Sequence, residues 1–318
     1  MLFRSPTSAK KHGLQVGYIR GRMTALLAYI PSPSSGSFSI GPLTLHMYGL
    51  MLLIGIAACI WLTGRRWVRW GGDWDLIFRM SLWGVIAGII GARAYHDITS
   101  WNQDQTIHQH WYGFAAVWDG GLGIWGAIPV GVLAGAWVVR RSGNSVRLMM
   151  DAVAPGLLLA QGIGRWGNYW NQELYGKPTS LPWGLHIDQN HKGSIPSEDQ
   201  IYSHFHPIFL YEFLWDTLGV GVLLWIDRRF TLKRPSLFAL YVVWYTTFRT
   251  FEEILRIDPS NHFLGMRINF WVSLVVWICA VAFFIWWQFK RVSSDSSSPK
   301  PRKIETGPTM AVPKSRVR

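Results

Sequence analysis

The sequence predicts an all-α polytopic membrane protein with about seven transmembrane helices and a small extracytoplasmic head. One supporting observation is composition: 49% of the 318 residues are hydrophobic and only 15% are charged, a balance that is unusual for a soluble domain. Another is the count of 20 tryptophans, since the amphipathic indole is favoured at the two water interfaces of a bilayer. A third is the spacing of apolar segments and basic residues along the chain.

Seven apolar segments approach the length of about 20 residues that a helix needs to cross a bilayer. The fourth and the sixth are the shortest of them. In chain order the predicted spans are residues 43–64, 75–96, 115–138, 149–165, 208–226, 236–252 and 268–288.

Basic residues follow every second apolar segment, as the positive-inside rule requires of cytoplasmic loops. We therefore expect the C-terminus in the cytoplasm and the connections at about 97–114, 166–207 and 253–267 on the exterior. The basic residues after the first, third, fifth and seventh segments are Arg65, Arg66, Arg69, Arg140, Arg141, Arg147, Arg228, Arg229, Lys233, Arg234, Lys290 and Arg291.

The predicted organisation has three parts. Residues 1–40 form a basic N-terminal extension and extracytoplasmic lead-in, residues 41–289 form the seven-span transmembrane domain, and residues 290–318 form a disordered cytoplasmic tail. Turn-favouring glycines and prolines predict an ordered external head at about 166–207. The formal net charge of +13 lies in short loops and tails, not on one face among stacking aromatics, so we expect no nucleic-acid partner.

Ionisable and other strongly polar side chains occur at or near the ends of the predicted spans. At membrane depth an ionisable group is costly unless it is paired or reaches water, so each is a candidate for function. The predicted topology places nearly all of them toward the exterior, whereas random placement would scatter them over both leaflets. They are Arg93, His96, Asp97, Asp119, Arg165, Asn168, Glu212, Tyr245, Arg249 and Glu253.

Several of these residues have an ordinary structural alternative. Arg93 can extend to the interface without any further role, and Asp119 can cap the start of the third span. Glu253 lies four residues after Arg249, the spacing of a common helical ion pair. Glu212 can form hydrogen bonds within the helix bundle. The sequence leaves these alternatives open.

Arg165 is harder to explain as a structural residue. Asn168 and Gln172 share its helical face if the helix continues, and three hydrogen-bonding groups in a row suit either a polar ligand or a buried network. A second arginine, Arg249, approaches the same leaflet from another span. Guanidinium groups bind phosphate in bidentate fashion, so the pair indicates a phospholipid headgroup, bound either for chemistry or only for stability.

Six motifs, in this order, resemble prolipoprotein diacylglyceryl transferases, bacterial plasma-membrane enzymes that begin lipoprotein maturation. The most specific is GRWGNYWNQELYG at 164–176. The others are LHMYGLMLLIGI at 45–56, GARAY at 91–95, WDGGLGIWGA at 118–127, HPIFLYE at 206–212 and YTTFRTFEEILRIDP at 245–259. The resemblance runs from about Leu26 to Phe289.

The resemblance implies transfer of the diacylglyceryl group of phosphatidylglycerol to the lipobox cysteine thiol of a prolipoprotein signal peptide, with release of glycerol 1-phosphate. It implies a multi-pass plasma-membrane location, an active site toward the exterior, and phosphatidylglycerol, prolipoproteins and membrane lipids as partners. It assigns catalytic roles to Arg165, Arg249, Tyr48 and Glu173. Its substrate-binding residues are Arg165, Asn168, Asn171, Gly176, Tyr245, Glu253 and Arg256.

The general base for the thiol stays open. Many family members have a histidine in an FHGG run where this sequence has Trp125 in IWGA, and tryptophan cannot accept a proton. Glu173, Tyr48 and His96 are the alternatives. No metal-ligand spacing is visible, so we expect no metal and no cofactor.

Two rival functions are weighed against the transferase. One is a phospholipid-binding membrane transporter or scaffold, which would use the arginines only to hold a headgroup; the absence of an internal repeat argues against a transporter. The other is an intramembrane protease, which would need catalytic motifs that the sequence lacks.

Overall fold

The computed structural model describes residues 29–41, 43–101, 112–117 and 120–290, and this part of the chain is mostly helical. The predicted extension before residue 29 and the predicted tail after residue 290 lie outside it. Each predicted span corresponds to one helix. These helices are α2 (Met47–Arg69), α3 (Trp74–Thr99), α5 (Ile124–Arg141), α6 (Val146–Trp170), α7 (Ile208–Arg229), α8 (Ser236–Leu255) and α9 (Ile268–Ile285), the last continued by a π-helical turn, η4 (Trp286–Lys290).

Five of these helices, α2, α3, α6, α7 and α9, are long and apolar enough to cross a membrane. The helices α5 and α8 are not among them. The reason is polarity: α5 has 18 residues and ends in two arginines, and α8 carries charged residues in its last two turns.

Several helix boundaries differ from the prediction. In the first predicted span, 43–64, residues Leu43–His46 form a strand, β3, and α2 continues to Arg69. The third predicted span starts at residue 115, but α5 begins only at Ile124 because Gly120 and Gly121 adopt positive φ angles of 88° and 65°, which a helix cannot include. Before them lies a short 3₁₀ turn, η1 (Gly113–Ala115). The fourth span is longer than predicted, because α6 continues through the polar sequence GRWGN to Trp170.

The described residues form two compact units, residues 29–62 with 153–290, and residues 63–152. In the second unit, α3 and α5 pack along a line of small residues. A Cβ atom added to Gly91 would lie 2.5 Å from the carbonyl oxygen of Gly126, and one added to Gly131 would lie 2.9 Å from that of Gly84. Small residues allow helices to approach closely in a membrane, where dispersion contacts replace the hydrophobic effect.

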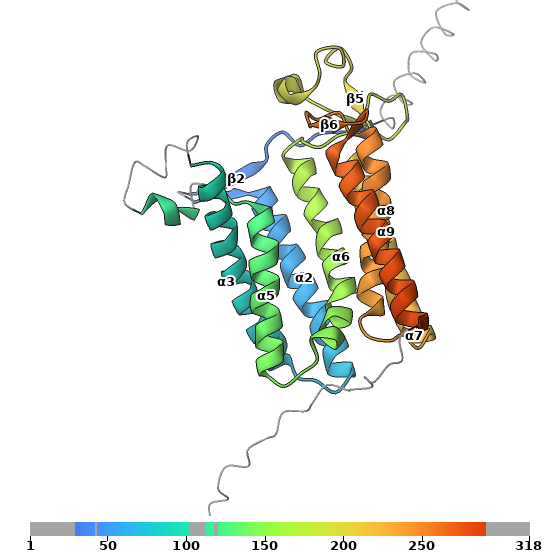
Figure 1. Cartoon of the computed structure of the whole chain (residues 1–318). Helices are drawn as coiled ribbons and strands as arrows, with labels where there is room; N and C mark the ends of the chain where they lie inside the picture. Colours follow the sequence, from blue (N-terminus) through green and yellow to red (C-terminus); the bar gives the residue numbers. More distant parts are fainter. Residues whose placement is uncertain (1–28, 42, 102–111, 118–119, 291–318) are drawn as a thin grey trace, which may run out of the picture. The chain divides into compact units, whose positions relative to one another are not determined.

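In the first unit, α6, α7 and α8 share an apolar core of Ala154, Leu158, Leu223, Leu237 and Tyr241, and α9 packs against α8. Figure 1 shows these helices side by side, with β5 and β6 at one end of them. The rings of Trp215 on α7 and Trp244 on α8 stack with centroids 4.5 Å apart. Each indole N–H donates to the other residue's carbonyl oxygen at 3.1 Å, so both polar groups are satisfied without water.

Residues 171–207 form a small folded element whose core contains Tyr175, Leu185, Ile187, Ile195, Phe205 and the adjoining Phe209. Its sheet has the order β1-β4-β5, with β1 (Tyr29–Ile30) parallel to β4 (Gly184–His186) and β5 (His204–Phe205) antiparallel to β4. A 3₁₀ turn, η3 (Gln189–Ser194), lies between β4 and β5. Two hairpins complete the unit: β2 (Ser37–Ile40) with β3 (Leu43–His46), and β6 (His262–Phe263) with β7 (Met266–Arg267).

We expect Gly91→Leu to lower the free energy of unfolding by about 1–3 kcal/mol, because the added side chain overpacks the close contact between α3 and α5. The measurement is the unfolding transition in mixed detergent micelles. Gly221→Leu is the matched control, because a Cβ at Gly221 on α7 has no atom within 4 Å. Equal effects of the two substitutions would contradict the packing argument.

Candidate functional site

The last turns of α6 carry the first part of the candidate site. Arg165 Nη1 donates to Asn168 Oδ1 at 3.5 Å, and Asn168 Nδ2 donates to Glu173 Oε1 at 2.9 Å. Asn171 Nδ2 donates to the same Glu173 oxygen at 3.4 Å. Glu173 therefore fixes the Asn168 amide with its oxygen toward Arg165. The structure joins four of the predicted site residues in one chain of contacts.

Tyr48, in the first turn of α2, lies against this end of α6. A Cβ atom added to Gly167 would lie 2.7 Å from Cδ2 of the Tyr48 ring. Gly167, which lies between Arg165 and Asn168 in the motif GRWGNYWNQELYG, thus leaves room for the Tyr48 ring.

The expectation that Gln172 shares a helical face with Arg165 is wrong. The helix ends at Trp170, and Gln172 has a φ of 49° that turns the chain out of the helix. Gln172 Nε2 donates instead to the carbonyl oxygen of Pro33 at 2.9 Å and to Asp188 Oδ2 at 3.0 Å. It connects the lead-in segment to the small folded element.

Gly176 has a structural role in the loop that follows. Its N–H donates to the carbonyl oxygen of His206 at 3.0 Å, and it forms a β-bridge with Arg256. A Cβ atom there would lie 2.8 Å from Cβ of His206. Only glycine fits where these three segments approach so closely. Through Gly176, the loop that follows α6 (residues 171–177, called the signature loop) is attached to the end of α8.

Arg249 on α8 is held by two carboxylates of the same helix. Its Nη1 lies 2.6 Å from Glu252 Oε2, and its Nη2 lies 2.5 Å from Glu253 Oε1. The predicted pair between Arg249 and Glu253 is confirmed. Both glutamates are buried, so these contacts compensate charges that water does not reach. The Tyr245 ring lies one turn earlier on α8 and stacks on Tyr241 with centroids 6.5 Å apart.

The network continues past the end of α8. Asp258 accepts two hydrogen bonds from Arg256, Oδ1 from Nε at 2.7 Å and Oδ2 from Nη2 at 2.9 Å, and a further one from Arg267 Nη2 at 2.8 Å. Arg267 Nε also donates to Glu253 Oε2 at 2.6 Å. Burial alone would raise the pKa of Asp258, but the hydrogen bonds from the two arginines hold it below its usual value.

Sequence reasoning missed Arg267, Glu252 and Asp258 as parts of the site. Glu252 and Asp258 lie within the motif YTTFRTFEEILRIDP. Both are acidic and close in sequence to Arg249 and Arg256, and this spacing could have identified them as ion-pair partners. Arg267 lies after a separate hairpin, and no local pattern connects it to α8.

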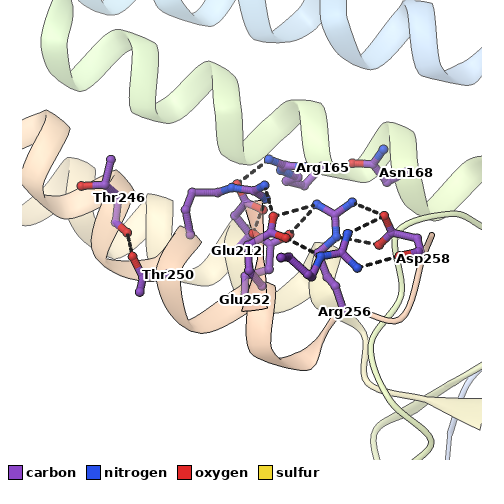
Figure 2. Close-up of polar contacts among 11 residues, drawn as sticks. Arg165, Asn168, Glu212, Thr246, Thr250, Glu252, Arg256 and Asp258 are labelled. Carbon is purple, nitrogen blue, oxygen red and sulfur yellow. Dashed lines mark hydrogen bonds and ion pairs between the residues drawn. The ribbon is translucent and has the colours of Figure 1, made fainter. Parts of the chain in front are cut away.

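Glu212 on α7 completes the cluster around Arg165. Its Oε1 lies 2.6 Å from Arg165 Nη2, and the glutamate side chain is only 1% exposed. Figure 2 shows Arg165, Glu212 and Glu252 together, with Arg256 and Asp258 farther along. Glu212 thus has an ion-pair partner within the bundle, as the structural alternative for this residue expected.

Asp216 lies one turn beyond Glu212 on α7 and is fully buried. Its Cβ would lie 3.1 Å from a Cβ added to Gly162 of α6. Neither of its carboxylate oxygens has a hydrogen-bond partner among the described residues. We call the combined set the acid–arginine cluster; it contains Arg165, Glu212, Asp216, Arg249, Glu252, Glu253, Arg256, Asp258 and Arg267.

In the second unit, Arg93 does not extend to the interface. It is 4% exposed and donates to the carbonyl oxygens of Gly113 at 2.6 Å, Phe114 at 3.1 Å and Gly120 at 2.9 Å. Its Nε also lies 3.0 Å from Asp97 Oδ1. Arg93 thus fixes the segment before α5. His96 packs against Gly121, where a Cβ atom would lie 2.5 Å from its Nε2.

Trp125 lies in the first turn of α5 with 67% of its side chain exposed. Asp119 lies outside the described residues, so its role at the start of the third span stays a prediction.

No group of three or more histidine, cysteine, aspartate or glutamate side chains suitable for a metal ion occurs among residues 29–41, 43–101, 112–117 and 120–290. The acid–arginine cluster contains five carboxyl groups beside its four guanidinium groups, and the guanidinium groups have the geometry that binds phosphate in bidentate fashion.

The model of one protein family, prolipoprotein diacylglyceryl transferase, matches residues 35–286. The chain belongs to this family. The match includes α2 to α9, the small folded element and every residue of the acid–arginine cluster.

Relatives of the family from actinobacteria are similar over most of their length. A phosphatidylglycerol–prolipoprotein diacylglyceryl transferase of Bifidobacterium adolescentis is 45% identical over 290 residues, which are 87% of this chain and 85% of the relative. The transferase 2 of Streptomyces coelicolor is 47% identical, covering 80% of each chain. That of Cutibacterium acnes is 46% identical, covering 86% of this chain and 91% of the relative.

We expect Glu253→Gln and Arg267→Gln each to lower the free energy of unfolding by about 3–5 kcal/mol, because each leaves a buried charge without its partner. The double substitution should cost less than the sum by about 1 kcal/mol or more. A double-mutant cycle of unfolding transitions in detergent measures this coupling. Additive effects would show that the 2.6 Å contact between the two residues contributes nothing of its own.

Proposed function

We propose that Arg165 and Arg249 bind the phosphate of phosphatidylglycerol while its diacylglyceryl group is transferred to the cysteine of a prolipoprotein. The transfer itself, the first step of lipoprotein maturation, is the activity of the family to which the chain belongs. The observation that carries the proposal is the meeting of guanidinium groups from α6 and α8 at one buried cluster. Arg165 pairs there with Glu212 at 2.6 Å, and Arg249 pairs with Glu252 at 2.6 Å.

The chemistry explains why two arginines are needed. A thiolate attacks the glycerol carbon that bears the phosphate, and negative charge grows on the leaving phosphate oxygen as the carbon–oxygen bond breaks. Fixed guanidinium groups in a site shielded from water stabilise that charge far better than solvent does. Arg165 and Arg249 would hold the leaving glycerol 1-phosphate, and Asn168, oriented by Glu173, would add a neutral contact.

The other predicted substrate-binding residues support this site in different ways. Tyr48 and Tyr245 present aromatic rings beside Arg165 and Arg249 and are proposed to contact the lipid. Glu253 and Arg256 hold Arg249 and the end of α8 in place. Gly176 and Asn171 shape the signature loop and are proposed to act through it. Glu173 is proposed to orient Asn168. This role replaces that of the general base for the thiol, for which Glu173 was one of the alternatives.

The alternative function is a transporter or scaffold that binds the phospholipid without chemistry. The same arginines would serve it, so the distinction depends on product formation. A thioether-linked diacylglyceryl peptide, detected by mass spectrometry after incubation with phosphatidylglycerol and a lipobox peptide, would exclude it.

The seven helices are proposed as seven membrane spans, with α5 and α8 crossing as part of the bundle. The distribution of arginines supports a cytoplasmic C-terminus. Arg140 and Arg141 end α5, and Arg228 and Arg229 end α7, at the end of that helix opposite to Glu212. This orientation places the cluster and the small folded element on the exterior side, where a prolipoprotein cysteine emerges.

We expect Arg165→Ala and Arg249→Ala each to slow transfer by about 100-fold to 1,000-fold, the usual cost of losing one charge-stabilising donor. The rate of adduct formation by mass spectrometry checks this, with unfolding transitions to establish that the variants fold. Arg79→Ala is the control, since Arg79 forms an exposed pair with Asp75 and should leave the rate unchanged. Normal turnover in either cluster variant would refute the assignment.

We expect a reporter fused after residue 290 to be active only on the cytoplasmic side, because basic residues follow α5, α7 and α9. A cysteine introduced at Lys177, in the signature loop, should react with an impermeant maleimide added to intact cells. A cysteine introduced at Ser142, after α5, is the control and should react only after the membrane is opened. The reverse pattern would invert the proposed orientation.

A further inference from the structure

Arg165 is already occupied by a carboxylate. Glu212 Oε1 lies 2.6 Å from its Nη2, and 18% of the Arg165 side chain is exposed against 1% of Glu212. A phosphate that reaches Arg165 from the exposed side must therefore share the guanidinium with Glu212 or take it over. Any role of Glu212 while phosphate engages Arg165 rests on the proposed phosphate site.

The groups around Glu212 offer little to replace Arg165. From α8 it faces Tyr245, Arg249 and Glu252, and Arg249 is already paired with Glu252 and Glu253. On α7 itself, Asp216 follows one turn later, buried and without a hydrogen-bond partner among the described residues. Glu212 without Arg165 would be a buried carboxylate next to other acids.

The charge of the acid–arginine cluster also favours a proton on Glu212 when phosphate engages Arg165. The acid–arginine cluster contains five carboxyl groups and four guanidinium groups, and a phosphodiester adds one more negative charge. An ion pair makes a carboxylate a weak base toward a thiol, whereas loss of the pair and the presence of like charges make it a stronger one. A proton on Glu212 would relieve the excess of negative charge at the moment when Arg165 is engaged with the phosphate.

We propose that Glu212 is the catalytic residue that accepts the proton of the lipobox thiol, after the lipid phosphate has taken Arg165 from it. The thiol proton moves to the Glu212 carboxylate as sulfur forms its bond to the glycerol carbon. The bond from that carbon to the phosphate oxygen breaks, and its electron pair leaves with glycerol 1-phosphate on Arg165 and Arg249. The departing phosphate takes the proton from Glu212, and the pair with Arg165 forms again.

This role answers the question that the sequence left open. Trp125 cannot accept a proton. Glu212 is a carboxylate in direct contact with the arginine proposed to bind the reacting phosphate. Because a free thiol has a pKa near 8.5, only a few per cent is thiolate at pH 7, and a base activated by phosphate binding would release the thiolate only when the lipid is in place.

The test is Glu212→Gln, which keeps the size of the side chain and an oxygen that accepts from Arg165 but cannot take a proton. We expect the affinity for phosphatidylglycerol vesicles to be unchanged or tighter, because a charged competitor is gone. The single-turnover rate with lipobox peptide at pH 7 should fall by about 100-fold or more, the usual contribution of a general base. Between about pH 6 and pH 7.5 the residual rate should rise about tenfold per unit, following the free thiolate, and it should level off as the pH passes the thiol pKa.

A second variant supports the test if Glu212→Gln fails to fold. Asp216→Asn removes one neighbouring acid, so Glu212 should hold its proton less tightly and the acid limb of the wild-type pH–rate profile should move to lower pH. Glu198→Gln, on the exposed surface of the small folded element, is the control and should leave the profile unchanged.

Several results would overturn the role of Glu212. They are a Glu212→Gln rate within threefold of wild type at pH 7, a deficit that is the same at every pH, loss of lipid binding in the folded variant, or an unmoved acid limb in Asp216→Asn. Failure of the phosphate site would look different, since Arg165→Ala and Arg249→Ala would then keep normal rates whatever Glu212→Gln does.

Discussion

The compensation of buried arginines by buried carboxylates is the constraint on which this site depends. An unpaired charge at the end of a membrane helix is costly, so Arg165 and Arg249 can be placed there only if acids from neighbouring segments meet them. Glu212 from α7 and Glu252 and Glu253 from α8 provide those contacts. The packing of α6, α7 and α8 and the position of the arginines therefore determine each other.

Contacts made by neighbouring loops and helices help to hold these arginines and carboxylates in place. Gly176 allows the signature loop to lie against the end of α8, and Gly167 allows the Tyr48 ring to lie against α6. Arg267 brings the β6–β7 hairpin to Glu253 and Asp258. These contacts restrict the motion of the groups that face the substrate, which favours a site organised before the substrate binds. The arginines are paired with acids in the structure, so the proposed binding of phosphate would rearrange some of these pairs.

Much of the fold could be predicted from the sequence. Apolar length located a helix in every predicted span, since a membrane helix satisfies its own backbone and needs mainly apolar side chains. The boundaries were less accurate where local conformation decided them, as at Gly120 and Gly121 before α5 and at Gln172 after α6. Of the cluster, Arg165, Glu212, Arg249, Glu253 and Arg256 were predicted from the sequence. Glu252, Asp258 and Arg267 were not, because their importance lies in the oppositely charged side chains that they contact.

The sequence by itself determined that the chain is a helical membrane protein of the prolipoprotein diacylglyceryl transferase family, and it predicted Arg165 and Arg249 as site residues. Apolar runs and a specific motif are local properties, readable from one segment at a time. Only the tertiary structure decided that Glu212 pairs with Arg165, that Arg267 pairs with Glu253, and that the buried Asp216 has no hydrogen-bond partner among the described residues. Those facts depend on distances between side chains far apart in the chain, and these are set by how the helices pack.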